Sequence, residues 1–182
     1  MAQKADDSKW ERRNLVRFAI AMSDVRVATE TCDLMLVDRP DPVTDPRYWA
    51  YHTAIVNAYA RPFTENKPLG KLPASVVKIL TRGERDLHDQ LLDDRKTASA
   101  HSDLTAKPVY FMPGGAKLEQ TGQIADSGGF IISKTAWGFA TWEAIKVLTL
   151  RVGAHVEGEA FWLLKEVYGD LYAPTMIRIE VD

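Results

Sequence analysis

The segment from Leu15 to Leu36, LVRFAIAMSDVRVATETCDLML, predicts one long amphipathic helix. Apolar and small residues recur in it at alternating steps of three and four, which places them on one side of a helix. This stripe contains Leu15, Phe18, Met22, Val25, Thr29, Cys32 and Leu36. A helix with such a stripe is expected to pack against other helices in a bundle.

Sequence signals also predict where this helix begins and ends. Ser8, with Glu11 three residues later, fits a capping box at the N-terminus. Pro40 and Pro42 end the helix, because two prolines within three residues cannot continue it.

Three further helical segments are expected. Asp45 as the cap and Pro46 in the first turn begin a helix that ends near 61–63. Its buried side consists of Tyr48, His52, Ile55 and Tyr59. A second segment covers 74–100 with a kink at Gly83, and a third follows Ser133 as cap and reaches 168, either as one helix or as two.

The pattern changes between 108 and 132. Apolar runs at 108–112 and 128–132, a weaker one at 117–124, and glycine-rich turns between them predict a small β-hairpin or a three-stranded flap. The alternating tail 175–181 predicts a strand or an extended docking arm. The whole chain, 1–182, is therefore predicted to be one mainly α-helical domain with a β-like insertion at about 108–132.

The composition restricts the classes of function that fit this chain. Charged residues make up 26% of the 182 residues and the net charge is -2, so any nucleic-acid binding has to be local. The single cysteine, Cys32, excludes an internal disulfide and occupies an apolar helical position, which indicates a core residue. No apolar stretch is long enough to span a membrane, and the polar N-terminus favours a cytoplasmic protein.

The stretch Arg95-Lys96-Thr97-Ala98-Ser99-Ala100-His101 carries the chemistry. A guanidinium can hold a phosphate, and an imidazole that titrates near neutral pH can move the proton of an attacking hydroxyl. These two groups suffice in principle to cleave RNA without a metal. On a regular helix Arg95 and His101 lie roughly 120° apart, so their convergence requires a frayed helix end or a second subunit.

At these residues the chain resembles HEPN domains, the higher-eukaryote and prokaryote nucleotide-binding superfamily. The hallmark is an arginine, four to six residues and a histidine near the end of a helix, and Arg95-x5-His101 fits it. The Ala100-His101-Ser102-Asp103 ending and the earlier Tyr59-Ala60-Arg61-Pro62-Phe63 segment are similar to those of stand-alone bacterial members. The position after the arginine, usually polar Asn, Asp or His, is Lys96.

The resemblance implies a HEPN-like helical bundle that forms a homodimer, with Arg95 and His101 of both subunits in one cleft. Many members are metal-independent endoribonucleases of toxin–antitoxin, abortive-infection or CRISPR-linked defence systems, whereas others only bind. We therefore expect an RNA-binding protein that cleaves RNA through attack by the ribose 2′-hydroxyl. The alternatives are a non-catalytic dimeric interaction or nucleotide-binding module, and an antitoxin-like inhibitor of a protein partner.

Four other residues are candidate RNA or phosphate contacts: Lys96, Ser99, Ser102 and His88. His88 lies seven residues before Arg95, on nearly the same helix face, and could join the cleft, although we favour a packing or polar interface role. A basic stripe at Lys9, Arg13 and Arg17 fits either an RNA backbone or a solvated surface. No residue spacing indicates a metal site, and no cofactor is expected.

Overall fold

The computed structural model describes residues 2–65, 67–99, 109–112, 115, 129–132 and 136–169. They form a mainly α-helical protein whose contacts divide the chain into two compact units. The first contains residues 1–95 and 138–182, and the second contains 96–137. The prediction of a single domain remains a prediction.

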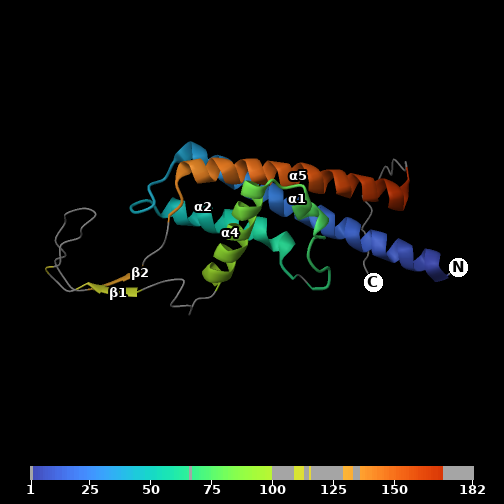
Figure 1. Cartoon of the computed structure of the whole chain (residues 1–182), viewed down its shortest axis with the longest axis horizontal. Helices are drawn as coiled ribbons and strands as arrows, with labels where there is room; N and C mark the ends of the chain where they lie inside the picture. The colour runs from blue at the N-terminus through green and yellow to red at the C-terminus, as the bar shows by residue number, and fades with distance from the viewer. Residues whose placement is uncertain are drawn as a thin grey trace. The chain divides into compact units, whose positions relative to one another are not determined.

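The first unit is built on two long helices, α1 (Ala2–Asp38) and α5 (Phe139–Tyr168), which lie side by side (Figure 1). The second helix, α2 (Pro46–Ala60), packs against α1. A short 3-10 turn, η1 (Arg61–Phe63), follows α2 directly and also contacts α1. Two further helices, α3 (Ser75–Lys78) and α4 (Arg82–Ser99), complete the helical part, and α4 runs across the direction of the long pair.

The buried face of α1 differs by one position from the predicted stripe. Leu15, Phe18, Val25 and Cys32 are buried as expected. Met22, Thr29 and Leu36 are only partly buried, and the intervening positions are taken by Ala21, Ala28 and Met35. The cause is that α1 contacts both α5 and α2, so two neighbours define its buried face. The small alanines let the partner helices approach closely.

Several boundaries agree with the sequence signals and several do not. Asp45 caps α2 as predicted, and α1 ends at Asp38 before Pro40. The predicted cap at Ser8 is wrong, because α1 already begins at Ala2. The predicted cap at Ser133 is also wrong: α5 has Gly138 at its N-cap and continues without a break to Tyr168.

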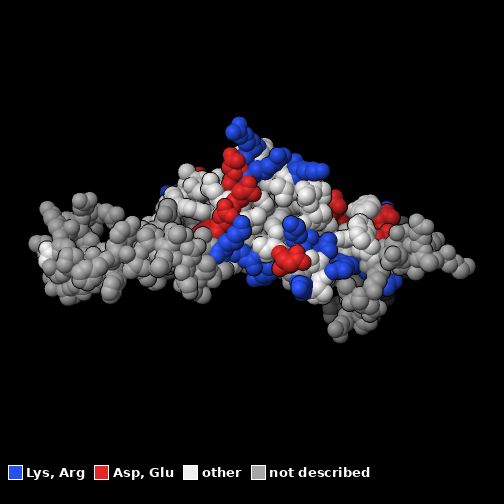
Figure 2. Space-filling view, turned by 60° about the horizontal axis from the view of Figure 1, so that its bottom comes forward, with Lys and Arg blue, Asp and Glu red and all other residues white. Residues whose placement is uncertain are grey.

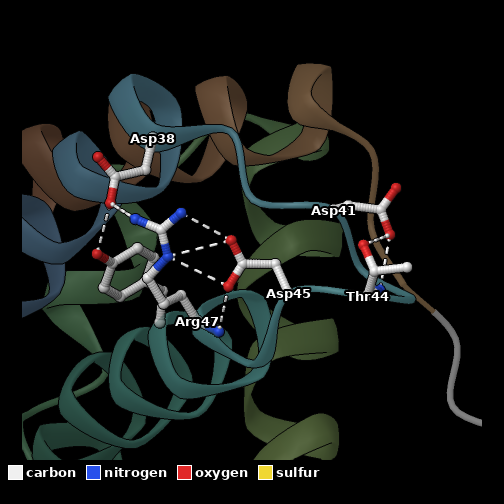
Figure 3. Close-up of polar contacts among 6 residues, drawn as sticks. Asp38, Asp41, Thr44, Asp45 and Arg47 are labelled. Carbon is white, nitrogen blue, oxygen red and sulfur yellow. Dashed lines mark hydrogen bonds and ion pairs between the residues drawn. The ribbon is translucent and has the colours of Figure 1, made fainter.

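The link between α1 and α2 is held by carboxylates. One oxygen of Asp41 accepts the backbone N–H groups of Val43 and Thr44, each at 2.8 Å. The Arg47 guanidinium binds Asp45 at 2.7 Å and Asp38 at 3.1 Å, and these charges meet across the turn (Figure 3). These hydrogen bonds lower the pKa of Asp41 and of Asp45, so both stay ionised and keep the turn in place.

The region 74–100 is interrupted earlier than predicted. The break lies at Ile79–Thr81, between α3 and α4, and Gly83 is inside the first turn of α4. Thr81 and Glu84 form a reciprocal capping box: Glu84 accepts the Thr81 N–H at 2.8 Å, and the Thr81 hydroxyl faces the Glu84 N–H at 3.4 Å. Glu84 also binds Arg151 of α5 at 2.7 Å, so the cap joins α4 to the long pair.

In the second unit, β1 (Val109–Met112) pairs antiparallel with β2 (Gly129–Ile132), with Tyr110 opposite Ile131. The segment 117–124, a candidate third strand, lies outside the described residues, and so does the tail 175–181. The flap as a whole therefore stays a prediction.

Other predictions on burial were confirmed. The predicted inner side of α2, Tyr48, His52, Ile55 and Tyr59, is buried, and Cys32 belongs to the core. Burial raises the pKa of the Cys32 thiol to about 12, so it stays protonated and behaves as an apolar side chain.

We expect Thr81→Ala to lower the free energy of unfolding by about 1 kcal/mol, because the first turn of α4 loses its cap. Urea denaturation measures the change. Thr81→Ser should retain most of the stability, and Thr53→Ala, at an exposed position of α2, is the matched control. An unchanged midpoint for Thr81→Ala would show that α4 does not depend on this cap.

Candidate functional site

The candidate site is centred on Arg95, one turn before the end of α4. Its side chain is partly buried, and its Nη1 donates to the Thr64 hydroxyl just after η1. The same nitrogen lies 3.5 Å from the carbonyl oxygen of Ala60, the last residue of α2. The guanidinium is therefore held at the point where α2 ends and the chain turns away.

The turn itself follows from Pro62. Proline has no N–H to donate, so the α2 hydrogen-bond ladder stops and η1 forms. Thr64 closes this turn: its N–H and its hydroxyl both donate to the Arg61 carbonyl, at 3.3 and 3.1 Å. The Thr64 oxygen can then accept from Arg95, so the turn fixes the arginine of α4.

Arg61, at the start of η1, points the other way, to α1. Its Nη1 binds Oδ1 of Asp24 at 2.6 Å. Asp24 is 8% exposed, and within the described residues its second oxygen, Oδ2, has no hydrogen-bond partner. Burial raises the pKa of Asp24, while the charges of Arg61 and Arg95 oppose that rise. Arg61 thus binds this buried carboxylate directly, and the charge of Arg95 acts on it without a direct contact.

His88 lies beneath this site, not in it. The residue is 3% exposed, and its Nδ1 is 2.9 Å from the hydroxyl of buried Tyr59. Burial raises the pKa of Tyr59, so the phenol keeps its proton and donates to Nδ1. The His88 proton then lies on Nε2. The ring also packs edge-on against Phe63, with 4.6 Å between ring centroids. This geometry favours the packing role for His88.

The structure places only some of the predicted site residues. Lys96 is exposed on α4, and Ser99 is the last residue of that helix. His101 and Ser102 lie outside the described residues, so their relation to Arg95 stays a prediction. The residues that Arg95 contacts, Thr64 and Ala60, were not predicted as part of the site, and neither was the nearby Arg61–Asp24 pair. Asp24, a carboxylate beside apolar positions of α1, was the available signal.

The predicted basic stripe on α1 has a structural use. The Arg17 Nε donates to the Leu69 carbonyl at 2.7 Å, and its Nη1 donates to Asn14 at 2.8 Å. Arg13 donates to the Pro68 carbonyl. These arginines therefore hold the loop between η1 and α3 against α1. Neither of the two predictions for this stripe, an RNA contact or a solvated surface, included this role.

The charge on this part of the molecule is mixed. Figure 2 shows basic and acidic side chains interleaved on one face of the described region, with several Lys and Arg side chains gathered around an acidic group. No cluster of three potential metal ligands occurs within the described ranges. None of the helices in the described part is both long and apolar enough to cross a membrane.

His88 should make folding sensitive to mild acid. Burial lowers its pKa below the ordinary value of 6.5, so just below pH 6.5 the unfolded chain binds a proton that the folded protein does not. The His88 contribution is complete above pH 6.5 and is lost as the pH falls towards the lowered value. We expect wild type to lose up to about 1.4 kcal/mol per pH unit more than His88→Gln there.

Urea denaturation at several pH values between 7.5 and about 5 measures this difference. His155→Gln, on α5, tests whether the loss of any histidine has the same effect. Parallel pH profiles for wild type and His88→Gln would contradict the assignment.

Comparison of the chain with protein-family models, with curated proteins and with solved structures gave no match in any of the three searches.

Proposed function

We propose that this protein binds RNA and cleaves it without a metal, with Arg95 and His101 as its catalytic residues. The setting would be a toxin or defence system, as the resemblance to HEPN domains implies. The observation that carries the proposal is the position of Arg95. Its guanidinium is partly buried and fixed by Thr64, and its charge acts on Asp24, the carboxylate that binds a second arginine, Arg61.

This arrangement suits a phosphate. Arg61 is paired with Asp24, whereas the Arg95 guanidinium donates to the neutral Thr64 hydroxyl, so the Arg95 charge can interact with a phosphate. Arginine is well matched to phosphodiester oxygens because its planar fork donates two parallel hydrogen bonds. Fixing the side chain in advance also reduces the entropy that is lost when the ligand binds.

The proposed reaction needs only the two residues and the RNA itself. His101 takes the proton from a ribose 2′-hydroxyl, and the oxygen attacks the neighbouring phosphorus. Arg95 stabilises the charge on the phosphorane. A second histidine, from the partner subunit of the proposed homodimer, protonates the leaving 5′-oxygen. The products are a 2′,3′-cyclic phosphate and a 5′-hydroxyl.

The proposed homodimer follows from helix geometry. α4 is regular as far as Ser99, and side chains six residues apart on a regular helix point roughly 120° away from each other. Arg95 and His101 therefore meet only if the helix frays before His101 or a second subunit supplies the histidine, and we propose the second subunit. Cytoplasmic location belongs to the same proposal.

A non-catalytic binding module is the second candidate. Arg95 already links α4 to the end of α2 through Thr64, which is a sufficient structural reason for an arginine there. Lys96, at a position that is usually Asn, Asp or His in the family, also favours binding without turnover. In this case the same site would hold RNA, a nucleotide or an acidic protein partner such as an antitoxin.

Incubation of the purified protein with mixed RNA in EDTA tests the main proposal. We expect wild type to leave cyclic-phosphate ends, and His101→Ala to slow cleavage by about 10²-fold or more. Arg95→Lys, which keeps the charge but loses the fork, should also be slow. Arg85→Ala, exposed on the same helix, is the control, and thermal unfolding verifies that each variant is folded. No cleavage by wild type would favour the binding module.

Mixing two inactive variants tests the shared site. If Arg95 and His101 act across the dimer, Arg95→Ala and His101→Ala subunits should recover part of the wild-type cleavage rate when they are allowed to exchange. Neither variant alone should do so. Size-exclusion chromatography with light scattering reports the oligomeric state of each sample. Active wild type with no recovery in the mixture would mean that one Arg95 and one His101 from different subunits do not suffice for cleavage.

A further inference from the structure

The structural role of Arg61 does not explain why so much of its side chain is exposed. One nitrogen, Nη1, binds buried Asp24 at 2.6 Å, yet about half of the side chain, 52%, stays exposed to solvent. A guanidinium has five N–H donors in a fixed plane, and this ion pair uses one of its nitrogens. Arg61 is thus anchored at one edge while much of its surface remains open.

Arg61 lies beside a hollow in a positively charged part of the surface. A shallow hollow lies beside the Arg61–Asp24 pair, and Arg17 and Gly70 also line it. Gly70 has φ +75, and a Cβ built there would lie 3.5 Å from Arg17 Nη2, so the loop backbone approaches the guanidinium closely. Arg17 donates to the neutral carbonyl of Leu69, which leaves its charge in place.

Carboxylates offset this charge only in part. Asp24 acts on Arg61 and Arg95, and Glu65 acts on Arg17. Arg17 and Arg61 line the hollow with one carboxylate, Asp24, and the charge of Arg13 also acts on Arg17, which keeps this part of the surface positive. Asp24 is held in the core, so it can orient Arg61 without covering its exposed edge.

We propose that Arg61, oriented by Asp24, forms a second phosphate subsite that binds an RNA phosphodiester next to the one held by Arg95. Arg61 is a binding residue in this scheme, and Asp24 is a positioning residue. The inference rests on the proposed RNA binding and extends it: the bound strand would run across η1, which supplies Arg61 and leads directly to Thr64.

The test uses the whole protein and a 2′-O-methyl oligouridylate, which binds like RNA but cannot be cleaved through its 2′-oxygen. Asp24→Asn/Arg61→Gln removes both charges and leaves the net charge unchanged. Arg26→Gln/Glu30→Gln is the matched control, because it removes an exposed ion pair on the same helix, α1. Fluorescence anisotropy gives the dissociation constant at a series of salt concentrations.

Loss of one phosphate contact should reduce the slope of log affinity against log salt by about 0.7. We expect this change in Asp24→Asn/Arg61→Gln and a wild-type slope in the control. Asp24→Asn alone keeps the Arg61 charge but loses its orientation, so it should bind more weakly than wild type while it keeps most of the wild-type salt slope. If its slope falls as far as that of the double variant, the effect is structural and the subsite is overturned.

Two further outcomes separate this inference from the proposed function. If the double variant keeps the wild-type slope while Arg95→Ala loses part of it, RNA binding at Arg95 stands and the Arg61 subsite is wrong. If wild type does not bind the oligonucleotide at all, both ideas fail.

Discussion

The contact between α1 and α5 is the constraint on which the rest of the helical unit depends. Small residues, Ala21 and Ala28, lie on the buried side of α1, and Gly153 of α5 lies beside Val25 of α1. The two long helices pack along each other, and they bury a face that is mostly apolar. Once they are paired, α2 and η1 can occupy only the remaining side of α1, which brings Arg61 above Asp24.

The turn at η1 positions the side chains of the candidate site. Pro62 stops α2, so Arg61 and Thr64 emerge in succession from a tight turn, and one reaches α1 while the other reaches α4. The His88–Tyr59 hydrogen bond and the contact between His52 Nε2 and the Asp94 carboxylate at 3.0 Å hold α4 on α2 from the buried side. Arg95 is thus placed by contacts that are polar but largely local to the end of α2.

Much of the helical architecture was predictable from local signals. The heptad-like pattern of α1, the Asp45–Pro46 start of α2 and the proline that ends it are properties of short segments, and all three appear in the structure. One error came from a local signal that fits a capping box but falls inside a longer helix, as with Ser8 in α1. Another arose where a neighbour decided the outcome, as with Ala21 in place of Met22 on the buried face.

The sequence by itself determined that the chain is mainly helical and that Arg95 is a candidate for binding phosphate. It did so because helix periodicity, caps and the charge of a guanidinium are fixed by residue type and spacing. Only the tertiary structure decided that Arg95 meets Thr64, that Asp24 lies beneath Arg61, and that His88 is a packing residue. Those contacts join segments about thirty or more residues apart, and the packing angles that bring such segments together are not encoded in any one of them.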